Sequence, residues 1–147
     1  MGLVFVGLLV GCAAFPASSG ASPDASAIRR LLEEHYFRGM DALDFEVFAP
    51  AFHRDARLAF VVDGALVQLD LAAWRERLDE LRADADHPLH HERSEKSIDE
   101  VQVVGDTARA TVRFVFPSRT YTDFLQLVRV DGRWQILSKV FDLEVKT

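Results

Sequence analysis

The chain has 147 residues, of which 49% are hydrophobic and 27% are charged, so it is about long enough for one globular domain. These values exclude a disordered chain and a collagen-like one. The formal net charge is −6 and no run of Lys or Arg is present, so we expect no nucleic-acid partner. The single cysteine excludes an intramolecular disulfide and a multi-cysteine metal site.

The N-terminal segment has the composition of an export signal. It carries no charged side chain through residue 14, and its apolar run over 3–10 is too short to span a bilayer as a finished helix. Leu9–Cys12 resembles a bacterial lipobox, which implies cleavage before Cys12 and lipidation of its thiol. We therefore predict an exported lipoprotein on the periplasmic side, with the lipid at Cys12 as its only membrane contact. The alternatives are a plain signal cut near Ala14 or Ala21, giving a secreted or periplasmic protein, and a cytosolic protein.

Residues 15–25 are rich in Pro, Ser, Gly and Ala, a composition typical of a flexible tether. The predicted organisation is a signal and tether over residues 1–25 and one folded domain over 26–147. No internal repeat divides the second part further.

The folded part begins with helices. Asp24 or Ser26 can cap the first helix. Its large side chains recur at helical spacing, at Ile28, Leu31, Leu32, His35 and Tyr36. A short second helix is predicted over 45–52, and Asp70 caps a third helix that ends before Pro88.

The remaining apolar runs predict strands. Asp63-Gly64 lies between apolar runs at 57–62 and 65–69, and Asp-Gly in this position is the strongest short signal for a hairpin. Four longer runs predict an antiparallel meander over 92–104, 107–116, 121–130 and 133–143, with two-residue turns at Gly105-Asp106 and Asp131-Gly132. Helices gathered on one face of such a sheet make an α+β domain.

The tight turns predict which residues of the meander lie side by side on its inner face. One row is wholly apolar and contains Val101, Ala110, Leu127 and Ile136. The next row contains Asp99, Val112, Leu125 and Ser138, and the row beyond it contains Ser97, Phe114, Asp123 and Val140. Polar groups thus enter the inner face at one end only, as in a ligand pocket. A bulge in either long strand would invert the rows beyond it.

The outer face of the meander is mixed and includes Phe124, Leu137 and Lys139. It carries too many large apolar groups for a bare surface, so we expect a homodimer through the sheet. A second protein partner on this face is the alternative.

The order helix, helix, hairpin, helix, meander resembles the nuclear transport factor 2-like superfamily, a cone-shaped fold shared by ketosteroid isomerase, scytalone dehydratase and SnoaL-like polyketide cyclases. Within it, the chain is most similar to the putative lumazine-binding family. The resemblance spans about residues 27–143 and is carried by Tyr36–Gly39, Phe52–Ala56, Val104–Ala108 and above all Tyr121–Phe141. It implies three helices packed on a curved, mostly antiparallel sheet, with a pocket for a small organic ligand inside the cone. The fold hosts enzymes and non-enzymes alike.

The candidate ligand-binding residues are Asp123, His53, Tyr36, Asp99, Ser138 and Phe114. Ketosteroid isomerase uses two carboxylates, one as a base and one as a hydrogen-bond donor, and Asp123 and Asp99 match them by type. His53 could act as a general acid or base, and the Tyr36 hydroxyl could orient a carbonyl group. Each has a structural alternative: a paired carboxylate at Asp123, a solvent-facing Asp99, a turn between His53 and Asp55, and a core tyrosine at Tyr36.

The cluster of His87, His90 and His91 lacks the regular spacing of zinc ligands, so we interpret these residues as surface histidines. No Gly-rich phosphate loop, nucleophile elbow or Cys/His pair is present, and we expect neither a metal nor a cofactor.

The predicted function is an exported small-molecule-binding domain, and whether it is an enzyme stays open. One alternative is a cofactor-independent isomerase, dehydratase or cyclase, in which His53 or Asp123 moves a proton and Tyr36 stabilises an oxyanion. The other is a protein-interaction domain. The enzyme requires at least two titratable groups that converge within hydrogen-bond reach in a closed pocket.

Overall fold

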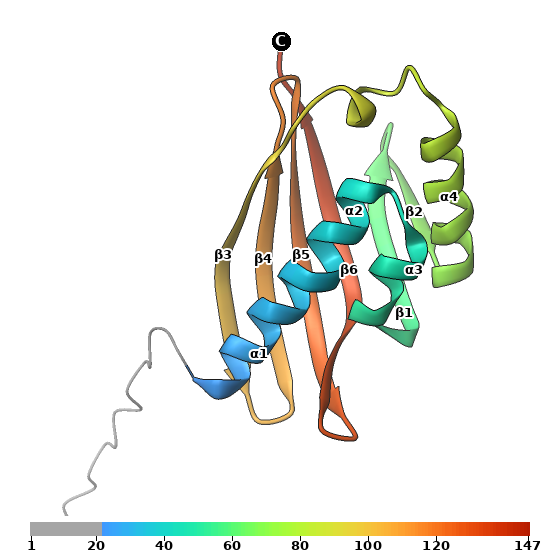
Figure 1. The fold of residues 1–147 in the computed structure, drawn as a ribbon. Coiled ribbons are helices and arrows are strands. Elements are labelled where there is room, and N and C mark those ends of the chain that lie inside the picture. Colours follow the sequence, from blue (N-terminus) through green and yellow to red (C-terminus); the bar gives the residue numbers. More distant parts are fainter. Residues whose placement is uncertain (1–21) are drawn as a thin grey trace, which may run out of the picture.

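The computed structural model describes residues 22–147, which form helices on one side of a single six-stranded sheet (Figure 1). The predicted α+β fold is therefore confirmed. The helical segments are α1 (Pro23–Leu31), the π-helix η1 (Leu32–Phe37), α2 (Arg38–Ala42), α3 (Phe45–Phe48), the 3-10 turn η2 (Ala49–Ala51), α4 (Leu71–Ala83) and the 3-10 turn η3 (Pro88–His90). The strands are β1 (Phe52–Val62), β2 (Ala65–Leu69), β3 (Glu95–Val104), β4 (Thr107–Val115), β5 (Arg119–Val130) and β6 (Arg133–Val145).

The first helix begins earlier than its sequence suggests. The Ser22 hydroxyl accepts a hydrogen bond from the Ala25 amide at 3.1 Å and caps α1, so the predicted caps at Asp24 or Ser26 are wrong by a few residues. Asp24 has another role. Its Oδ1 accepts hydrogen bonds from Arg129 Nη1 at 2.8 Å and from Trp134 Nε1 at 3.1 Å, which ties the start of the helix to the β5–β6 hairpin.

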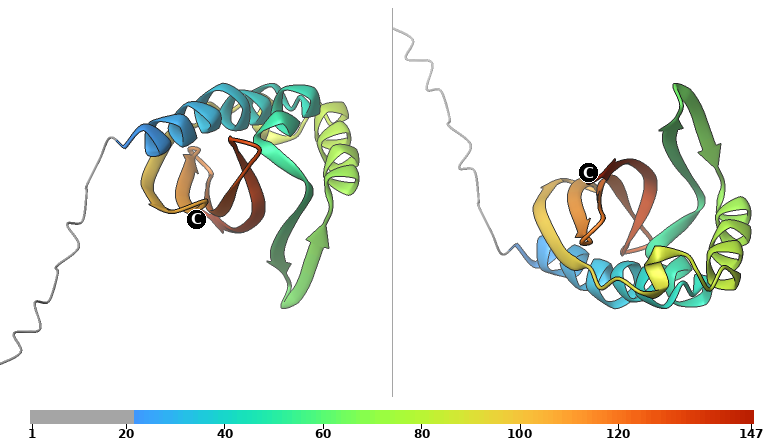
Figure 2. Two further views of the ribbon diagram at one scale, coloured as in Figure 1. Left: turned by 90° about the horizontal axis from the view of Figure 1, so that it is seen from below. Right: turned by 90° about the horizontal axis from the view of Figure 1, so that it is seen from above.

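The strands lie in the order β2-β1-β6-β5-β4-β3, and all neighbours are antiparallel except β1 and β6. The predicted hairpin is confirmed: Val62 pairs with Ala65, and Asp63 and Gly64 have the positive φ values, 50° and 78°, that a two-residue turn of this kind requires. Figure 2 shows that the sheet curls around the helices and that the β1–β2 hairpin projects away from the other strands, next to α4.

A bulge in β6 exchanges the faces of the residues that follow it. Leu127 pairs with Ile136, but Gln126 pairs with Ser138. Leu137 therefore has no partner in β5 and is the extra residue of the bulge. Every side chain beyond a bulge of this kind turns to the opposite face. Lys139, expected outside, therefore lies inside and is 3% exposed, and Ser138, expected inside, is away from the inner cavity.

A second bulge, in β3, corrects the expectation for Asp99. Ile98 pairs with Val112 and occupies the inner position that the register had assigned to Asp99. Asp99 faces outward, where it accepts hydrogen bonds from the Ser97 hydroxyl at 2.6 Å and from Arg113 Nε at 2.7 Å. The hydrogen bond from Ser97, together with the Arg113 charge, lowers the pKa of Asp99. Asp99 is thus a surface ion-pair residue.

The turn between β4 and β5 is tighter than expected. The Phe116 amide bonds the Arg119 carbonyl at 2.8 Å, and Asp123 pairs with Val112 where we expected Phe114. Because the register differs by two residues, each side chain keeps its predicted face. Asp123 and Phe114 both point inward and are buried.

The core fills the space between the helices and the inner face of the sheet. Its largest fully buried side chains include Tyr36, Phe48, Leu58, Leu78 and Leu125. Within residues 22–147, the buried polar or charged residues are Asp123 and Lys139. No helix in this part of the chain is long and apolar enough to cross a membrane.

Candidate functional site

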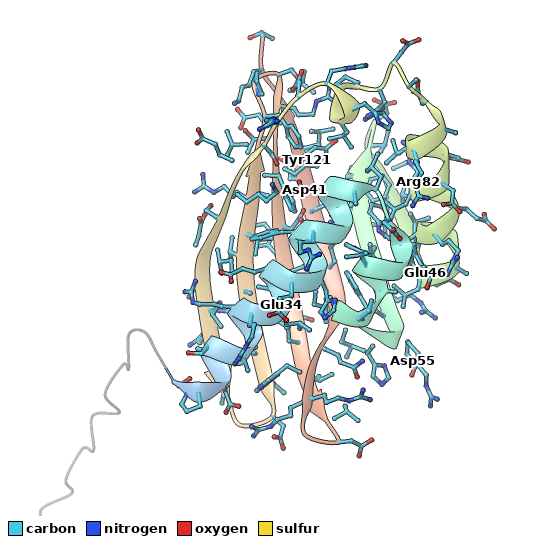
Figure 3. All side chains as sticks on the ribbon, viewed as in Figure 1. Glu34, Asp41, Glu46, Asp55, Arg82 and Tyr121 are labelled. Carbon is cyan, nitrogen blue, oxygen red and sulfur yellow. The ribbon has the colours of Figure 1, made fainter. Side chains whose placement is uncertain are left out.

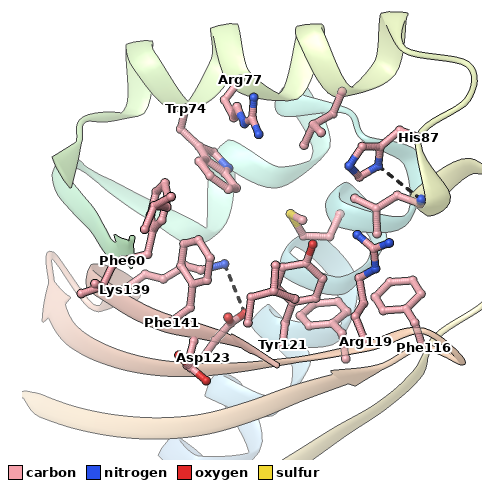
Figure 4. Close-up of a pocket in the computed structure, with 18 of the residues that line it drawn as sticks. Phe60, Trp74, Arg77, His87, Phe116, Arg119, Tyr121, Asp123, Lys139 and Phe141 are labelled. Carbon is pink, nitrogen blue, oxygen red and sulfur yellow. Dashed lines mark hydrogen bonds and ion pairs between the residues drawn. The ribbon is translucent and has the colours of Figure 1, made fainter. Parts of the chain in front are cut away.

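A cavity of about 450 Å³ opens between α4, the β1–β2 hairpin, the first half of β5 and the second half of β6 (Figure 4). This volume is in the range of small-molecule sites, about 300–1,000 Å³. Six aromatic residues line it, Phe60, Trp74, Phe114, Phe116, Tyr121 and Phe141. Polar side chains at Asp41, Arg77, His87 and Arg119 also line it. Figure 3 places Asp41 and Tyr121 at the same end of the molecule.

Three polar side chains meet at the wall of this cavity. The Tyr36 hydroxyl donates a hydrogen bond to Asp123 Oδ2 at 2.6 Å, and Lys139 Nζ lies 3.2 Å from the same oxygen. Asp123 and Lys139 line the cavity, and Figure 4 shows the contact between them. Tyr36 is fully buried beneath the pair. We call these three residues the buried triad.

Local irregularities of the chain position two members of the triad. Tyr36 lies in the wide turn η1, and such π-helical turns occur frequently at functional sites. Gly39, one turn later, packs against Phe48, where an added Cβ would come within 2.5 Å of the Phe48 backbone. The glycine thus permits the close contact between α2 and α3. The β6 bulge then turns Lys139 toward Asp123, which the regular alternation of β5 already directs inward.

Burial determines the electrostatics of the triad. Desolvation, reinforced by the negative charge and hydrogen bond of Asp123, raises the pKa of Tyr36 well above 10, so this hydroxyl stays a donor. Desolvation lowers the pKa of Lys139, although Asp123 acts in the opposite direction. Lys139 Nζ also lies 4.7, 5.1 and 5.4 Å from the ring centres of Phe141, Tyr36 and Trp74. The amine is enclosed by aromatic rings and has one acidic partner among residues 22–147.

Two buried polar atoms of residues that line the cavity have no hydrogen-bond partner among residues 22–147. They are Asp123 Oδ1, an acceptor, and Trp74 Nε1, a donor. Leaving a buried polar atom unpaired costs about 1–3 kcal/mol. A hydroxyl group on a bound molecule could donate to Asp123 Oδ1 and accept from Trp74 Nε1, whereas a carbonyl group could only accept from Trp74.

The structure brings together half of the predicted site residues. Asp123 and Phe114 line the cavity, and Tyr36 bonds Asp123. His53 lies at the start of β1, away from the cavity, where its Nδ1 accepts a hydrogen bond from the Asp55 amide at 3.2 Å. This is the turn that the structural alternative described. Asp99 and Ser138 lie elsewhere on the sheet, as described above.

Sequence reasoning missed the contributions of Lys139 and Trp74. Lys139 was expected on the outer face because the rows were extended through the bulge, and Trp74 was not among the predicted site residues. One signal was available: Lys139 is flanked by the apolar residues Leu137, Val140 and Phe141 in a strand that is otherwise core-like. A lone lysine in such a strand needs a buried partner or a bulge.

The three histidines between α4 and β3 bond nearby backbone groups. Nε2 of His90 lies 2.8 Å from the Leu81 carbonyl, and Nε2 of His91 lies 2.7 Å from the Ala85 carbonyl. His87 lines the cavity, and burial lowers its pKa, with the charge of Arg119 acting in the same direction. Residues 22–147 contain no group of three or more His, Cys, Asp or Glu side chains arranged to hold a metal ion.

Residues 23–142 match the model of a protein family described as putative lumazine-binding. The chain belongs to this family. It is also similar to the "Aldolase FrzH" of Cladobotryum sp, with 32% identity over 92 residues, which cover 61% of this chain and 68% of the relative.

Solved structures show the same fold. An NTF2-like protein of unknown function from Shewanella baltica OS155 has a TM-score of 0.71 and 24% identity, covering 85% of this chain and 98% of the neighbour. A ketosteroid isomerase-like protein from Erwinia carotovora atroseptica has a TM-score of 0.64 and 13% identity, covering 84% and 98%. The predicted nuclear transport factor 2-like fold is therefore confirmed.

Proposed function

We propose that this domain is a cofactor-independent enzyme that binds a small, largely apolar carbonyl compound and moves a proton at the carbon next to the carbonyl group. The observation that carries this proposal is the convergence of Asp123 and Lys139, 3.2 Å apart, at the wall of an aromatic cavity. The enzyme requires at least two titratable groups within hydrogen-bond reach in a closed pocket, and the contact between Asp123 and Lys139 supports it. Within residues 22–147, the carboxylate is bonded by Tyr36 and Lys139 and by no loop amide.

Each wall residue has a definite part in such a reaction. Trp74 Nε1 and the Lys139 amine can donate hydrogen bonds to a carbonyl oxygen and stabilise the charge that develops there. Asp123 Oδ1, which has no partner among residues 22–147, can accept the proton from the neighbouring carbon. Tyr36 is a positioning residue that holds the other carboxylate oxygen. The aromatic wall excludes water, which strengthens all of these interactions.

The names of similar proteins agree with this class of chemistry. An aldolase, the name of the Cladobotryum relative, makes or breaks a carbon–carbon bond beside a carbonyl group. One structural neighbour is described as ketosteroid isomerase-like, and a ketosteroid isomerase moves a proton at such a carbon. Aldol addition and ketosteroid isomerisation both begin with the removal of a proton next to a carbonyl. That shared step is the one we assign to Asp123.

Binding without turnover is the second candidate, because the volume and aromatic lining of the cavity suffice to retain a small molecule. Dimerisation through the outer face stays a prediction, supported by the exposed Phe124 and Leu137 on that face. Export and lipidation at Cys12 also stay predictions, since residues 1–21 lie outside the described part of the chain.

The test is exchange of carbon-bound hydrogen. The full chain is incubated in D₂O with a panel of ketones and aldehydes, including cyclohexanone and phenylacetone, and deuterium at the carbon beside the carbonyl is measured by mass spectrometry. We expect exchange above the buffer rate with at least one probe. Asp123→Asn should reduce it by about 10²-fold or more, the usual contribution of a general base.

The matched control is Asp99→Asn, which removes an exposed carboxylate from the same sheet and should leave exchange unchanged. Native mass spectrometry of the purified chain runs in parallel. A retained small molecule with no exchange of any probe would overturn the enzyme in favour of binding alone. Equal exchange by wild type and Asp123→Asn would overturn the assignment of the base to Asp123.

A further inference from the structure

We propose that Lys139 is a covalent catalytic residue, whose side-chain amine forms a Schiff base with the carbonyl carbon of the bound molecule. The proposal rests on the proposed function, since it requires a carbonyl compound in the cavity. It adds a bond that proton transfer by Asp123 does not need. It would place the chain among enzymes that activate carbonyl compounds through a lysine.

The location of the amine carries this proposal. Lys139 is 3% exposed, yet it lines the cavity and is surrounded by three aromatic rings. An amine in apolar surroundings favours its neutral form, which is the form that attacks a carbonyl carbon. Figure 4 shows the amine beside Asp123 at the cavity wall, so a nucleophile and a proton carrier are adjacent.

The other lysines of the chain lack this combination. Lys96 forms a 2.8 Å ion pair with Asp41 and does not line the cavity. Lys146 donates a hydrogen bond to the Phe116 carbonyl at 2.7 Å and is exposed. Because Lys96 also faces an aspartate, it provides an internal comparison for Lys139 that differs mainly in burial and access to the cavity.

A purely structural role for Lys139 explains less of the geometry. Its charge could serve only to compensate the buried Asp123, but such a pair would be best sealed inside the core, away from any cavity. Here both partners form part of the cavity wall, and Tyr36 supplies Asp123 with a hydrogen bond from the core side. The side of the pair toward the cavity is therefore free to react.

The proposed step balances within the pair. A proton passes from the Lys139 ammonium to Asp123, which leaves a neutral amine beside a carboxylic acid. The nitrogen lone pair adds to the carbonyl carbon, and one nitrogen proton moves to the oxygen to give a carbinolamine. Asp123 then protonates the hydroxyl group, which leaves as water. The products are an iminium ion on Lys139, a carboxylate on Asp123 and one molecule of water, so the net charge is unchanged.

The test is reductive trapping. The full chain is incubated with cyclohexanone and sodium cyanoborohydride, which delivers hydride to an iminium ion and makes the link permanent. Intact mass then shows a gain equal to the ketone less one oxygen atom, and peptide mapping locates it. We expect Lys139 to be labelled in at least about tenfold higher yield than Lys96, because burial lowers the pKa of the Lys139 amine and so favours its neutral form.

Two variants sharpen the result. Lys139→Arg keeps the positive charge opposite Asp123 but cannot form a Schiff base, so it should remove the label and most of the hydrogen exchange. Lys96→Arg is the matched control and should remove neither. The peptide map of the wild-type protein gives the answer even if Lys139→Arg fails to fold.

The outcomes separate this proposal from the proposed function. Hydrogen exchange by the wild type without a label on Lys139, or with labels only on Lys96, Lys146 or the amino terminus, overturns the Schiff base and leaves the Asp123 enzyme standing. Loss of exchange in Asp123→Asn together with full activity of Lys139→Arg overturns it as well. A label on Lys139 in a protein with no hydrogen exchange overturns the proposed function, while the amine retains its assigned reactivity.

Discussion

The sheet contains two carboxylate–cation pairs that look alike in chemistry and differ in setting. Asp99 and Arg113, on β3 and β4, lie 2.7 Å apart, and their side chains are 30% and 51% exposed. Asp123 and Lys139, on β5 and β6, lie 3.2 Å apart and are almost wholly buried. The shorter contact is the weaker determinant of the fold, because water screens it and solvates both partners when it breaks. The longer contact joins two charged groups that are almost wholly shielded from water, so neither is solvated when the contact is lost.

A bulge produces each pair. The extra residue in β3 turns Asp99 out of the cone, and the extra residue in β6 turns Lys139 into it. The same local device therefore removes one carboxylate from the candidate site and supplies the cation that the remaining carboxylate needs. The comparison shows that burial, more than the distance between the charged atoms, decides how strongly an ion pair affects stability.

The largest expected effect is that of Asp123→Asn. This change leaves Lys139 buried opposite a neutral amide, and loss of one partner of a buried pair costs about 3–5 kcal/mol. Urea unfolding followed by circular dichroism measures the change in the free energy of unfolding. A loss below about 1 kcal/mol would show that water reaches the pair and that the two regions are equivalent.

The next effect is that of Tyr36→Phe, which removes the hydrogen bond to the Asp123 carboxylate. A bond to a charged acceptor contributes about 1.5–3 kcal/mol, and urea unfolding near neutral pH should show a loss of that size. The aromatic contacts of the ring with Phe48 and Phe52 are kept.

The same variant has a pH signature. The pKa of Tyr36 is raised in the folded protein, so the stabilisation from its neutral form is complete below about pH 10 and is lost as the pH rises toward the folded pKa. The midpoint temperature of thermal unfolding should therefore fall more steeply above about pH 10 for the wild type than for Tyr36→Phe. Parallel curves would contradict the raised pKa.

A smaller effect is expected when the whole triad is replaced. Tyr36→Phe, Asp123→Leu and Lys139→Met together remove every charge and leave no partner unpaired. Replacing a buried ion pair by apolar residues is often neutral or stabilising, so we expect a free energy of unfolding within about 1 kcal/mol of the wild type. Hydrogen exchange and trapping should be absent. A triple variant as unstable as Asp123→Asn would mean that the pair itself stabilises the fold.

The smallest effect is that of Asp99→Asn, which removes the exposed pair. Surface ion pairs contribute about 0–1 kcal/mol, and added salt should reduce the difference from wild type further because exposed charges are screened. Unfolding in low and in high sodium chloride measures both quantities. A loss as large as that of Asp123→Asn would remove the contrast between the two regions.

Much of the fold follows from local signals in the sequence. The turns at Asp63-Gly64, Gly105-Asp106 and Asp131-Gly132 were correct because glycine and aspartate accept the positive φ values that these hairpins need. Asp123 was placed correctly on the inner face because an error of two residues in the register does not change the face of a strand.

The candidate site was only half predictable, because a bulge is decided by packing against distant elements. The lone Lys139 among apolar neighbours signals a buried partner or a bulge, but no local pattern marks Leu137 as the extra residue. The inward position of Lys139 depends on Asp123 in the neighbouring strand and on Tyr36, far away in the chain. The position of Asp99 likewise depends on Arg113. Alternation along a single strand contains no information about such partners.

The extra residue at Leu137 also has a consequence for how substitutions are tolerated along β6. Before it, the even-numbered Trp134 and Ile136 are buried, and after it, the odd-numbered Lys139 is. A deep mutational scan of this strand should therefore record a reversal of phase, with intolerance at even positions switching to odd positions within a few residues. Deletion of Leu137 would restore the regular alternation of β6 and turn the Lys139 side chain to the outer face. The amine would then leave the cavity although the lysine itself is unchanged, an effect that no substitution can produce.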